Sequence, residues 1–327
     1  MKVKSMSFPT VPLLIPTNYK GMKGVKILQS GMALVLVLWM VALLTIMAMG
    51  YSATMRTETR LTAHIVQSAR ARALSQAGIW YGLHELLLPT LEQTWRKDGT
   101  PYPINFGDGK ISISLYDETG KIDLNTARPE LLLSLIKSAG LGNNQSQSLL
   151  QAILDWRDRD NMKRNGGAED EDYAQAGYDY GAKDGPFNSV GELREVMGMN
   201  VALFDKIAPA LTVYSHQPAI NPTVAPREVL LSIPGADPSD IDALLQRRKT
   251  GEEGNLVLPD LDSRYLSKAS GSTFTVYSTG KSGESSFNTE AVILLKPNAP
   301  TPYIVLSWSE AVMVKKPQPG QGSRQHD

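Results

Sequence analysis

The sequence predicts an α+β fold in which a long N-terminal helix packs on an antiparallel sheet and a large all-α domain is inserted into that sheet. Three observations support this prediction. An uncharged apolar run stands near the N-terminus, strand patterns occur at 111–115 and return after residue 265, and helical patterns fill the interval between them. Because similar strands flank the helical interval, we expect them to share one sheet.

Composition places most of the chain among ordinary globular proteins. Of its 327 residues, 42% are apolar and 20% are charged, so the chain supports at most one membrane span beside its soluble part. Cysteine is absent, which excludes disulfides, thiolate metal sites and a cysteine nucleophile. Any bound metal must therefore be held by oxygen or histidine ligands.

The apolar run near the N-terminus is long enough to cross a membrane. No residue between Lys26 and Arg56 is charged, and a span needs about 20 helical residues. A removable secretory signal has an apolar core of only about 7–15 residues. Because lysines precede the run and the first acidic residue is Glu58, we expect a cytoplasmic N-terminus and an exported remainder. The predicted single-pass anchor includes Leu34, Leu36, Leu38, Trp39, Leu43 and Leu44.

The same helix is expected to continue beyond the membrane. Proline is absent from Tyr51 until Pro89, and apolar residues recur at steps of three and four. This pattern predicts one continuous helix over residues 32–92, the second half of which is amphipathic. A simple anchor with a helical stalk is the alternative interpretation. The predicted apolar face consists of Leu61, Ile65, Ala69, Ala73, Leu74 and Ala77.

Strand patterns predict a sheet domain built from residues 93–124 and 265–312. Alternating apolar residues at 111–115 indicate one strand, and a turn at residues 118–120 precedes a second short strand. Three further β-rich runs, STFTVYSTG, SSFNTEAVILLK and YIVLSWSEA, are separated by glycine and proline. The final segment, 313–327, is predicted to be a disordered tail.

Residues 125–264 are predicted to form the inserted helical domain. Asn125 or Thr126 is expected to cap a helix that has Pro129 in its first turn. A unit of helix, glycine turn and second helix recurs, at residues 125–154, 221–248 and, more loosely, 188–211. These units resemble helix-hairpin-helix motifs, which often bind nucleic acid through the amides of the glycine turn.

Side chains capable of chemistry concentrate in residues 155–184. The segment DWRDRDNMKRNGGAEDEDY carries acidic residues on both sides of a turn at 165–167. Oxygen ligands in such a loop suit calcium, although their spacing is not that of an EF-hand. Composition alone favours a solvated acidic loop, because four basic residues in the segment offer ion-pair partners.

At the start of the apolar run, a basic leader ends at Gly31 and an uncharged helix begins at Met32. This arrangement resembles the class III signal of type IV pilins and type II secretion pseudopilins. The resemblance implies that prepilin peptidase cleaves after Gly31 and removes residues 1–31, with Met22 as an alternative start. Glycine suits a cleavage site because it has no Cβ. The chain departs from the common pattern at Met32, where most members have phenylalanine, and at Leu36, where most have glutamate.

Four segments over residues 109–200 carry a closer resemblance: GKISISLYDETGKIDLNTARPELLLSLI, AILDWRDRD, GGAEDEDY and GPFNSVGELREVMGM. In this order they resemble the signature of the K-type minor pseudopilins (general secretion pathway protein K), which also lack this glutamate and are unusually large. The resemblance implies a pilin-like fold and a place at the tip of the type II secretion pseudopilus. There the subunit would help to initiate and cap the filament for export of folded proteins across the outer membrane. In this family the glutamate neutralises the amine of the subunit above, so a subunit without it suits the tip.

The resemblance also implies the location, the partners and the metal. It implies a single-pass protein of the inner membrane with most of the chain in the periplasm, and methylation. The implied partners are the I- and J-type minor pseudopilins, the major pseudopilin and prepilin peptidase. Calcium is the implied metal, and the residues that match the family's acidic pattern are Asp155, Asp158, Asp160, Glu169 and Asp170.

The alternative function is DNA binding, either in the envelope or by a type IV pilus minor pilin for DNA uptake. The first 31 residues hold five of the 33 basic residues and no acid. The remaining 28 basic residues therefore stand against 33 acidic ones, a net charge of −5. Phosphate binding calls for a basic patch, so we expect no nucleic acid partner. The cluster at residues 247–249 is the remaining candidate phosphate contact.

Catalytic patterns are weak throughout the chain. Its four histidines are scattered, and none has the spacing of a zinc pair. The many acids at 155–172 favour cation binding over a tuned pair of general acid and base. We therefore predict that the protein is not an enzyme.

Overall fold

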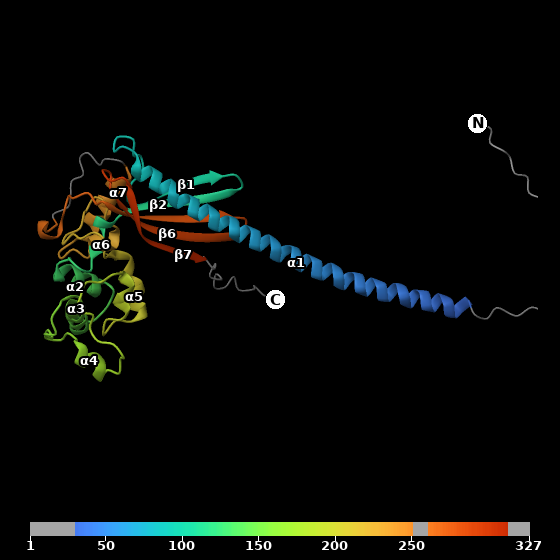
Figure 1. Cartoon of the computed structure of the whole chain (residues 1–327), viewed down its shortest axis with the longest axis horizontal. Coiled ribbons are helices and arrows are strands. Elements are labelled where there is room, and N and C mark those ends of the chain that lie inside the picture. Colours follow the sequence, from blue (N-terminus) through green and yellow to red (C-terminus); the bar gives the residue numbers. More distant parts are fainter. Residues whose placement is uncertain (1–29, 251–260, 313–327) are drawn as a thin grey trace, which may run out of the picture. The chain divides into compact units, whose positions relative to one another are not determined.

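The structure is a computed structural model that describes residues 30–250 and 261–312 (Figure 1). It divides into two compact units, Met1–Leu61 and Thr62–Asp327. The predicted tail, 313–327, and all but the last two residues of the predicted leader, 1–31, lie outside the described residues. The α+β class, with its long N-terminal helix and antiparallel sheet, is confirmed. The domain boundaries stay predictions.

The first element, α1, is a single helix of 58 residues, Ser30–Leu87. Among the described residues it is the one helix long and apolar enough to span a membrane. It ends five residues before the predicted position, because Pro89 cannot continue it. The chain then turns back, and the Glu85 carboxylate accepts hydrogen bonds from the backbone N–H of Thr94 (2.7 Å) and Trp95 (3.0 Å).

The face of α1 that packs on the sheet differs from the predicted one. Leu61 and Ile65, expected to be buried, are exposed, as are three of the four other residues of that face. Small side chains let the helix approach the sheet more closely than large apolar ones do. A search for regularly spaced apolar residues does not detect a buried face made of small residues. A Cβ on Gly78 would lie 2.0 Å from the Ser278 Oγ. The buried face consists of Ala71, Ser75, Gly78, Ile79, Gly82, Leu83 and Leu86.

This close approach of α1 to the sheet leads to a prediction about the free energy of unfolding. Gly78→Leu is expected to lower the free energy of unfolding by about 1–3 kcal/mol, because a larger side chain must push α1 away from the sheet. The exposed neighbour Ala77 provides the control, and Ala77→Leu is expected to change stability by less than about 0.5 kcal/mol. Thermal melts of both full-length variants in detergent provide the measurement. Equal losses in the two variants would contradict the assigned face.

The main sheet has five antiparallel strands in the order β1-β2-β5-β6-β7. Figure 1 shows labelled strands of this sheet side by side along the second half of α1, and Ile79 of α1 packs in one core with Ile113 and Val276. The strands are β1 (Asp98–Phe106), β2 (Gly109–Asp117), β5 (Thr273–Ser282), β6 (Ser285–Leu295) and β7 (Tyr303–Val312).

Two features of the sheet differ from the prediction. Strand β1 was not predicted, because Gly99, Pro101 and Pro103 interrupt its pattern. The short strand β3 (Ile122–Asp123), expected in the main sheet, pairs instead with β4 (Leu211–Thr212) in a separate parallel pair.

Between β2 and β5 the chain forms a helical region with its own apolar core. Three glycines with positive φ, Gly140, Gly198 and Gly235, make the turns of the three predicted units. The helices are α2 (Pro129–Ser138), α3 (Asn143–Arg157), α4 (Asp170–Gln175), α5 (Val201–Ile207), α6 (Arg227–Leu231) and α7 (Pro238–Lys249). Short 3-10 turns are η1 (Glu118–Gly120), η2 (Val190–Arg194), η3 (Ala208–Ala210) and η5 (Ser263–Tyr265).

The predicted cap of α2 is wrong, although the helix begins at Pro129 as expected. Its N-cap is Arg128, which makes no side-chain capping bond. The Asn125 side chain instead exchanges two hydrogen bonds with the backbone of Phe187, at 3.0 and 2.7 Å. Asn125 therefore ties the start of the helical region to its middle.

Buried acids join the helical region to the sheet. The Glu118 carboxylate accepts hydrogen bonds from Thr275 Oγ1 of β5 (2.7 Å), from Lys121 Nζ and from Thr212 Oγ1 of β4. The Asp123 carboxylate accepts one from the backbone N–H of His216 (2.8 Å). The Glu118 contacts join the start of the helical region to β4 and to β5 of the sheet, and the Asp123 contact joins β3 to the segment after β4.

Candidate functional site

The acidic residues of the predicted site meet where α3 ends and α4 begins. Asp155 lies in the last turn of α3 and is fully buried, and Asp158 is the C-cap of that helix. Glu169 is the N-cap of α4 and is 5% exposed, and Asp170 is its first residue. We call Asp155, Asp158, Glu169, Asp170 and Asp184 the acidic cluster.

One guanidinium neutralises part of the acidic cluster. Arg164 Nη1 donates to the Asp155 carboxylate at 2.7 Å and to the Asp158 carboxylate. These two hydrogen bonds raise the pKa of Arg164 above its ordinary value. The Asp158 Oδ1 is nevertheless buried without a hydrogen-bond partner. Among the described residues, Arg164 thus forms ion pairs with two of the five carboxylates in the cluster.

Glu169 has the most unfavourable environment in the cluster. Both of its carboxyl oxygens are buried and have no hydrogen-bond partner. Burial, together with the charges of Asp155, Asp184, Asp158 and Asp170, raises the pKa of Glu169 to about 7. Burial without partners costs a carboxylate several kcal/mol in its charged form. A cation bound here would remove that cost.

Two glycines leave room around the carboxylates. A Cβ on Gly167 would lie 1.9 Å from the Asp155 Oδ2, and a Cβ on Gly181 would lie 1.9 Å from the Asp170 Oδ1. Any other residue at these positions would displace the carboxylate beside it. The donor set therefore fits calcium in its chemistry, because it consists of hard oxygen ligands, two of them beside glycines that leave them space.

The structure places the five predicted ligands unequally. Asp155 and Glu169 are buried and Asp158 is half-buried, whereas Asp170 and Asp160 are exposed. The Asp160 Oδ1 accepts a hydrogen bond from the backbone N–H of Met162 at 3.0 Å. Within the described ranges, no three His, Cys, Asp or Glu side chains are arranged closely enough to hold a metal ion. The metal assignment of these five residues stays a prediction.

Sequence reasoning missed Asp184. Burial and the charges of Asp170, Asp158 and Asp160 raise its pKa above the ordinary value, and its Oδ1 is buried without a partner. Its backbone has a φ of 53°, a left-handed conformation that non-glycine residues seldom adopt. The Asp184-Gly185 pair within the acidic segment was the available signal, since this dipeptide marks turns.

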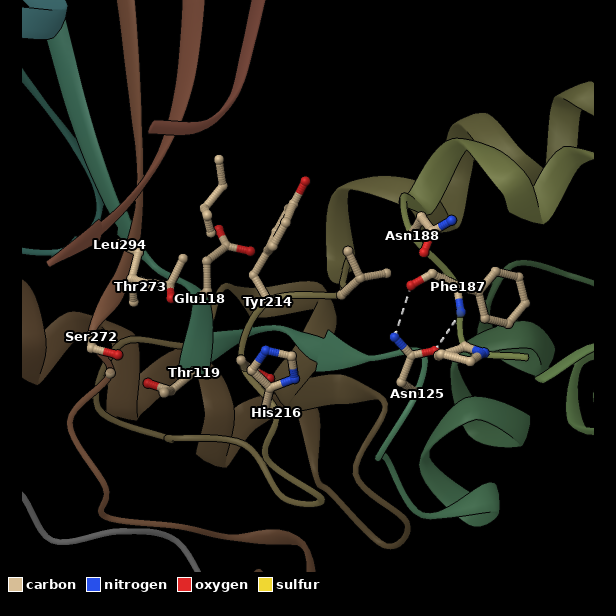
Figure 2. A pocket seen from close by; sticks show the side chains of 15 residues that line it. Glu118, Thr119, Asn125, Phe187, Asn188, Tyr214, His216, Ser272, Thr273 and Leu294 are labelled. Carbon is tan, nitrogen blue, oxygen red and sulfur yellow. Dashed lines mark hydrogen bonds between the residues drawn. The ribbon is translucent and has the colours of Figure 1, made fainter. Parts of the chain in front are cut away.

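A second candidate is a cavity of about 470 Å³ between the sheet and the helical region (Figure 2). Glu118, Tyr214 and His216 line one part, and Asn125 with Phe187 lines another, as Figure 2 shows. Leu294 of β6 and Leu306 of β7 add apolar surface. The Glu118 carboxylate is already hydrogen-bonded to Thr275, Lys121 and Thr212. Because this carboxylate is held by structural contacts, the cavity resembles a binding cleft more closely than a catalytic site.

The basic cluster at residues 247–249 does not form a free phosphate contact. Arg248 is 2% exposed, and its guanidinium donates to the carbonyl oxygens of Ala225 (2.7 Å) and Pro222. Arg248 thus joins α7 to the segment before α6, which corrects its candidate role as a phosphate ligand. Its neighbours Arg247 and Lys249 are exposed.

The predicted anchor residues all lie on the first half of α1. Each of them is well exposed, with Leu34 at 70% and Trp39 at 72%. Exposed apolar side chains along a helix with no charged residue between Met32 and Met55 agree with a segment that meets lipid or other helices. Gly31 and Met32, the predicted cleavage residues, stand at the start of α1, and their processing stays a prediction.

Comparisons with known proteins agree with the sequence motifs. The family model for protein K of the type II secretion system matches residues 113–216, which include the whole acidic cluster. A type II secretion system protein K from Pseudomonas aeruginosa is 25% identical over 249 residues, covering 69% of this chain and 74% of the relative. One from Klebsiella pneumoniae is 25% identical over 235 residues, covering 62% of this chain and 69% of the relative.

The fold has a solved counterpart. A chain in the crystal structure of the GspK-GspI-GspJ complex from the enterotoxigenic Escherichia coli type 2 secretion system superposes with a TM-score of 0.53. The match covers 79% of this chain and 99% of that one, at 19% identity, and shows a shared fold. The family model, the relatives and the shared fold all agree with the resemblance of the sequence motifs to K-type proteins of the type II secretion system.

Proposed function

We propose that this protein is a minor pseudopilin that sits at the tip of the type II secretion pseudopilus and helps to initiate and cap it. The observation that carries the proposal is the helical region of residues 118–272, inserted between two neighbouring strands of the sheet. In a filament whose subunits stack through their N-terminal helices, such an insertion obstructs a following subunit. The tip is the position at which it obstructs none.

Leu36 supports the same position. Most pilin-like subunits carry glutamate there, and the carboxylate neutralises the N-terminal amine of the subunit above. A buried amine without a partner costs several kcal/mol. Leu36 has no charge to offer, so a subunit placed above this one would keep its amine unpaired.

The proposed partners are the I- and J-type minor pseudopilins, followed by the major pseudopilin. The solved relative is a complex of GspK with GspI and GspJ, and we extend that association to this chain. The first half of α1 would hold the protein in the inner membrane, with its N-terminus cytoplasmic and Thr62–Asp327 in the periplasm. The role is that of a structural component of secretion, without catalysis of its own.

We further propose that calcium binds at the acidic cluster. The residues that would hold it are the five of the acidic cluster and Asp160 from the loop that follows α3. The unpartnered oxygens of Glu169, Asp158 and Asp184 support this assignment, as does the space left by Gly167 and Gly181. When bound, the ion supplies positive charge that offsets repulsion among these carboxylates and joins the end of α3 to the start of α4.

DNA binding is the less supported alternative. The three helix pairs with left-handed glycine turns favour it. The burial of Arg248 and the net negative charge of the chain after residue 31 argue against it. Phosphate contacts need exposed cations, which the candidate cluster supplies only at Arg247 and Lys249.

The proposal is tested by locating the chain in assembled pseudopili. The chain has no cysteine, so Asp179→Cys, at an exposed position of the helical region, gives a unique site for a gold label. Electron microscopy of overproduced pseudopili is expected to show one label at one end of each filament.

A filter-binding titration with duplex DNA at physiological salt is expected to show weak retention without saturation. Labels along the shaft, or saturable DNA binding, would contradict the proposal.

A further inference from the structure

The two edges of the five-stranded sheet are protected to very different degrees. A sheet edge exposes unpaired backbone N–H and C=O groups, and natural proteins usually block it with proline, charge, bulges or a short strand. Edge strand β1 has Pro101 and Pro103 and a register shift after Asp98. These features leave β1 a poor template for another strand.

The opposite edge, β7, has less such protection, which consists of one bulge at Leu306 and one charge at Glu310. It is ten residues long, against about five or six for a typical strand, and its sequence YIVLSWSEAV contains no proline or lysine. Among the described residues β7 pairs with β6 alone, so its outer row of backbone groups has no strand partner there. Its apolar side chains are exposed, with Ile304 at 39% and Leu306 at 42%.

The single charge of β7 does not guard this edge. The Glu310 carboxylate accepts hydrogen bonds from Gln76 Nε2 (2.7 Å) and Trp308 Nε1 (3.0 Å) and pairs with Arg72 (2.7 Å). It is therefore engaged with α1. An aromatic group lies beside it, in which the Trp80 ring is 6.0 Å from that of Trp308 and 6.4 Å from that of Tyr303. Trp80 is 49% exposed, so this group is available to an incoming chain.

The bulge in β7 links the edge to the cavity. Val292 pairs with Ser307 and Ile293 with Val305, so Leu306 is the extra residue of the bulge. Leu306 lines the cavity of about 470 Å³ described above. In strand addition, main-chain hydrogen bonds supply affinity and pockets beside the edge select alternate side chains. Both elements are present here, an open edge and an adjoining cavity.

We propose that β7 accepts an extended strand from another pseudopilin subunit, which continues the sheet beyond its fifth strand. The inference rests on the proposed function and names the surface through which it operates. The added strand would be free of proline and would place apolar or aromatic side chains against Trp80 and Trp308. Alternate side chains on its other face would point toward the cavity.

A second copy of this chain is the less suitable occupant. Two identical β7 edges that pair antiparallel are related by a twofold axis, which reverses every direction in the plane of the sheet. The Thr62–Leu87 part of α1 would then run in opposite directions in the two copies. Subunits anchored in one membrane must have this segment running the same way. A different subunit is under no such twofold constraint.

Hydrogen exchange tests the pairing directly. The full-length chain would be compared alone and in complex with its I- and J-type pseudopilins, in detergent. Amide exchange in β7 is expected to slow at least tenfold in the complex, whereas exchange in β1 stays unchanged. Unchanged exchange of β7 in an intact complex would overturn the strand-addition proposal and leave the proposed function standing. Absence of any complex would instead overturn both.

Matched variants identify the surface independently. Ser309→Lys in β7 is expected to weaken the complex at least tenfold, and Asn105→Lys in β1 is expected to leave it unchanged; both positions are exposed. Ser309→Cys carrying a benzophenone label is expected to form an adduct with the I- or J-type subunit, and Asn105→Cys is not. Adducts with a second copy of this chain, or equal adducts at both edges, would overturn the proposal.

Discussion

Gly31→Leu is expected to leave nearly all of the protein unprocessed, with its leader still attached. Cleavage requires extended backbone in the peptidase cleft, and glycine adopts such backbone without a Cβ to clash. The site lies where the basic leader meets the uncharged helix, so no nearby residue can replace it. N-terminal sequencing of membrane protein from cells that contain prepilin peptidase is the measurement, and the wild-type chain is expected to begin at Met32.

Gly24→Leu is the matched control, because Gly24 lies in the same leader seven residues earlier. That variant, and a chain started at Met22, are expected to be processed normally. A wild-type chain that stays unprocessed, or that has a mature terminus at any residue other than Met32, would refute the class III signal.

Calcium removal is expected to lower the melting temperature by about 5–10 °C. An ion present at 100 times its dissociation constant stabilises the folded state by about 2.7 kcal/mol, and 1 kcal/mol corresponds to about 2–4 °C in a domain of this size. The double variant Asp158→Ala/Asp160→Ala is expected to melt at one temperature with and without calcium. Glu169→Gln is expected to melt above the wild-type chain in chelator, because it removes a buried charge without partners.

Glu171→Gln is the control for this experiment. Glu171 lies on α4 next to the cluster but is exposed, so its variant is expected to keep the full calcium response. A wild-type chain that melts identically in calcium and in chelator would contradict calcium binding. It would indicate instead an acidic loop that Arg164 neutralises. The pseudopilin assignment does not depend on this result.

Local patterns in the sequence predicted most of the fold. The uncharged run predicted the first half of α1, and β-rich runs predicted β5, β6 and β7 within one or two residues, because these signals depend on local composition. Strand β1 was missed because its prolines mark an edge, where strand pairing tolerates them. The packed face of α1 was missed because Gly78, Ser75 and Ala71 are small, and contact with the sheet depends on shape as well as hydrophobicity.

The candidate site was predicted only in outline. Composition located the acidic segment, and the resemblance selected five residues within it. The burial of each of these residues depends on how the loops after α3 and α4 fold together. The position of Asp184 beside them depends on the same folding. Burial of Arg248 likewise depends on tertiary contacts with Ala225 and Pro222, which the basic cluster at 247–249 does not reveal.

We expect this chain to assemble with the smaller minor pseudopilins. Light scattering after size-exclusion chromatography, on the full-length chain mixed with its I- and J-type pseudopilins in detergent, measures this assembly. One peak is expected, with a mass that corresponds to one copy of each subunit. A peak of this chain alone, with both partners eluting separately at micromolar concentration, would refute both the assembly and the proposed function.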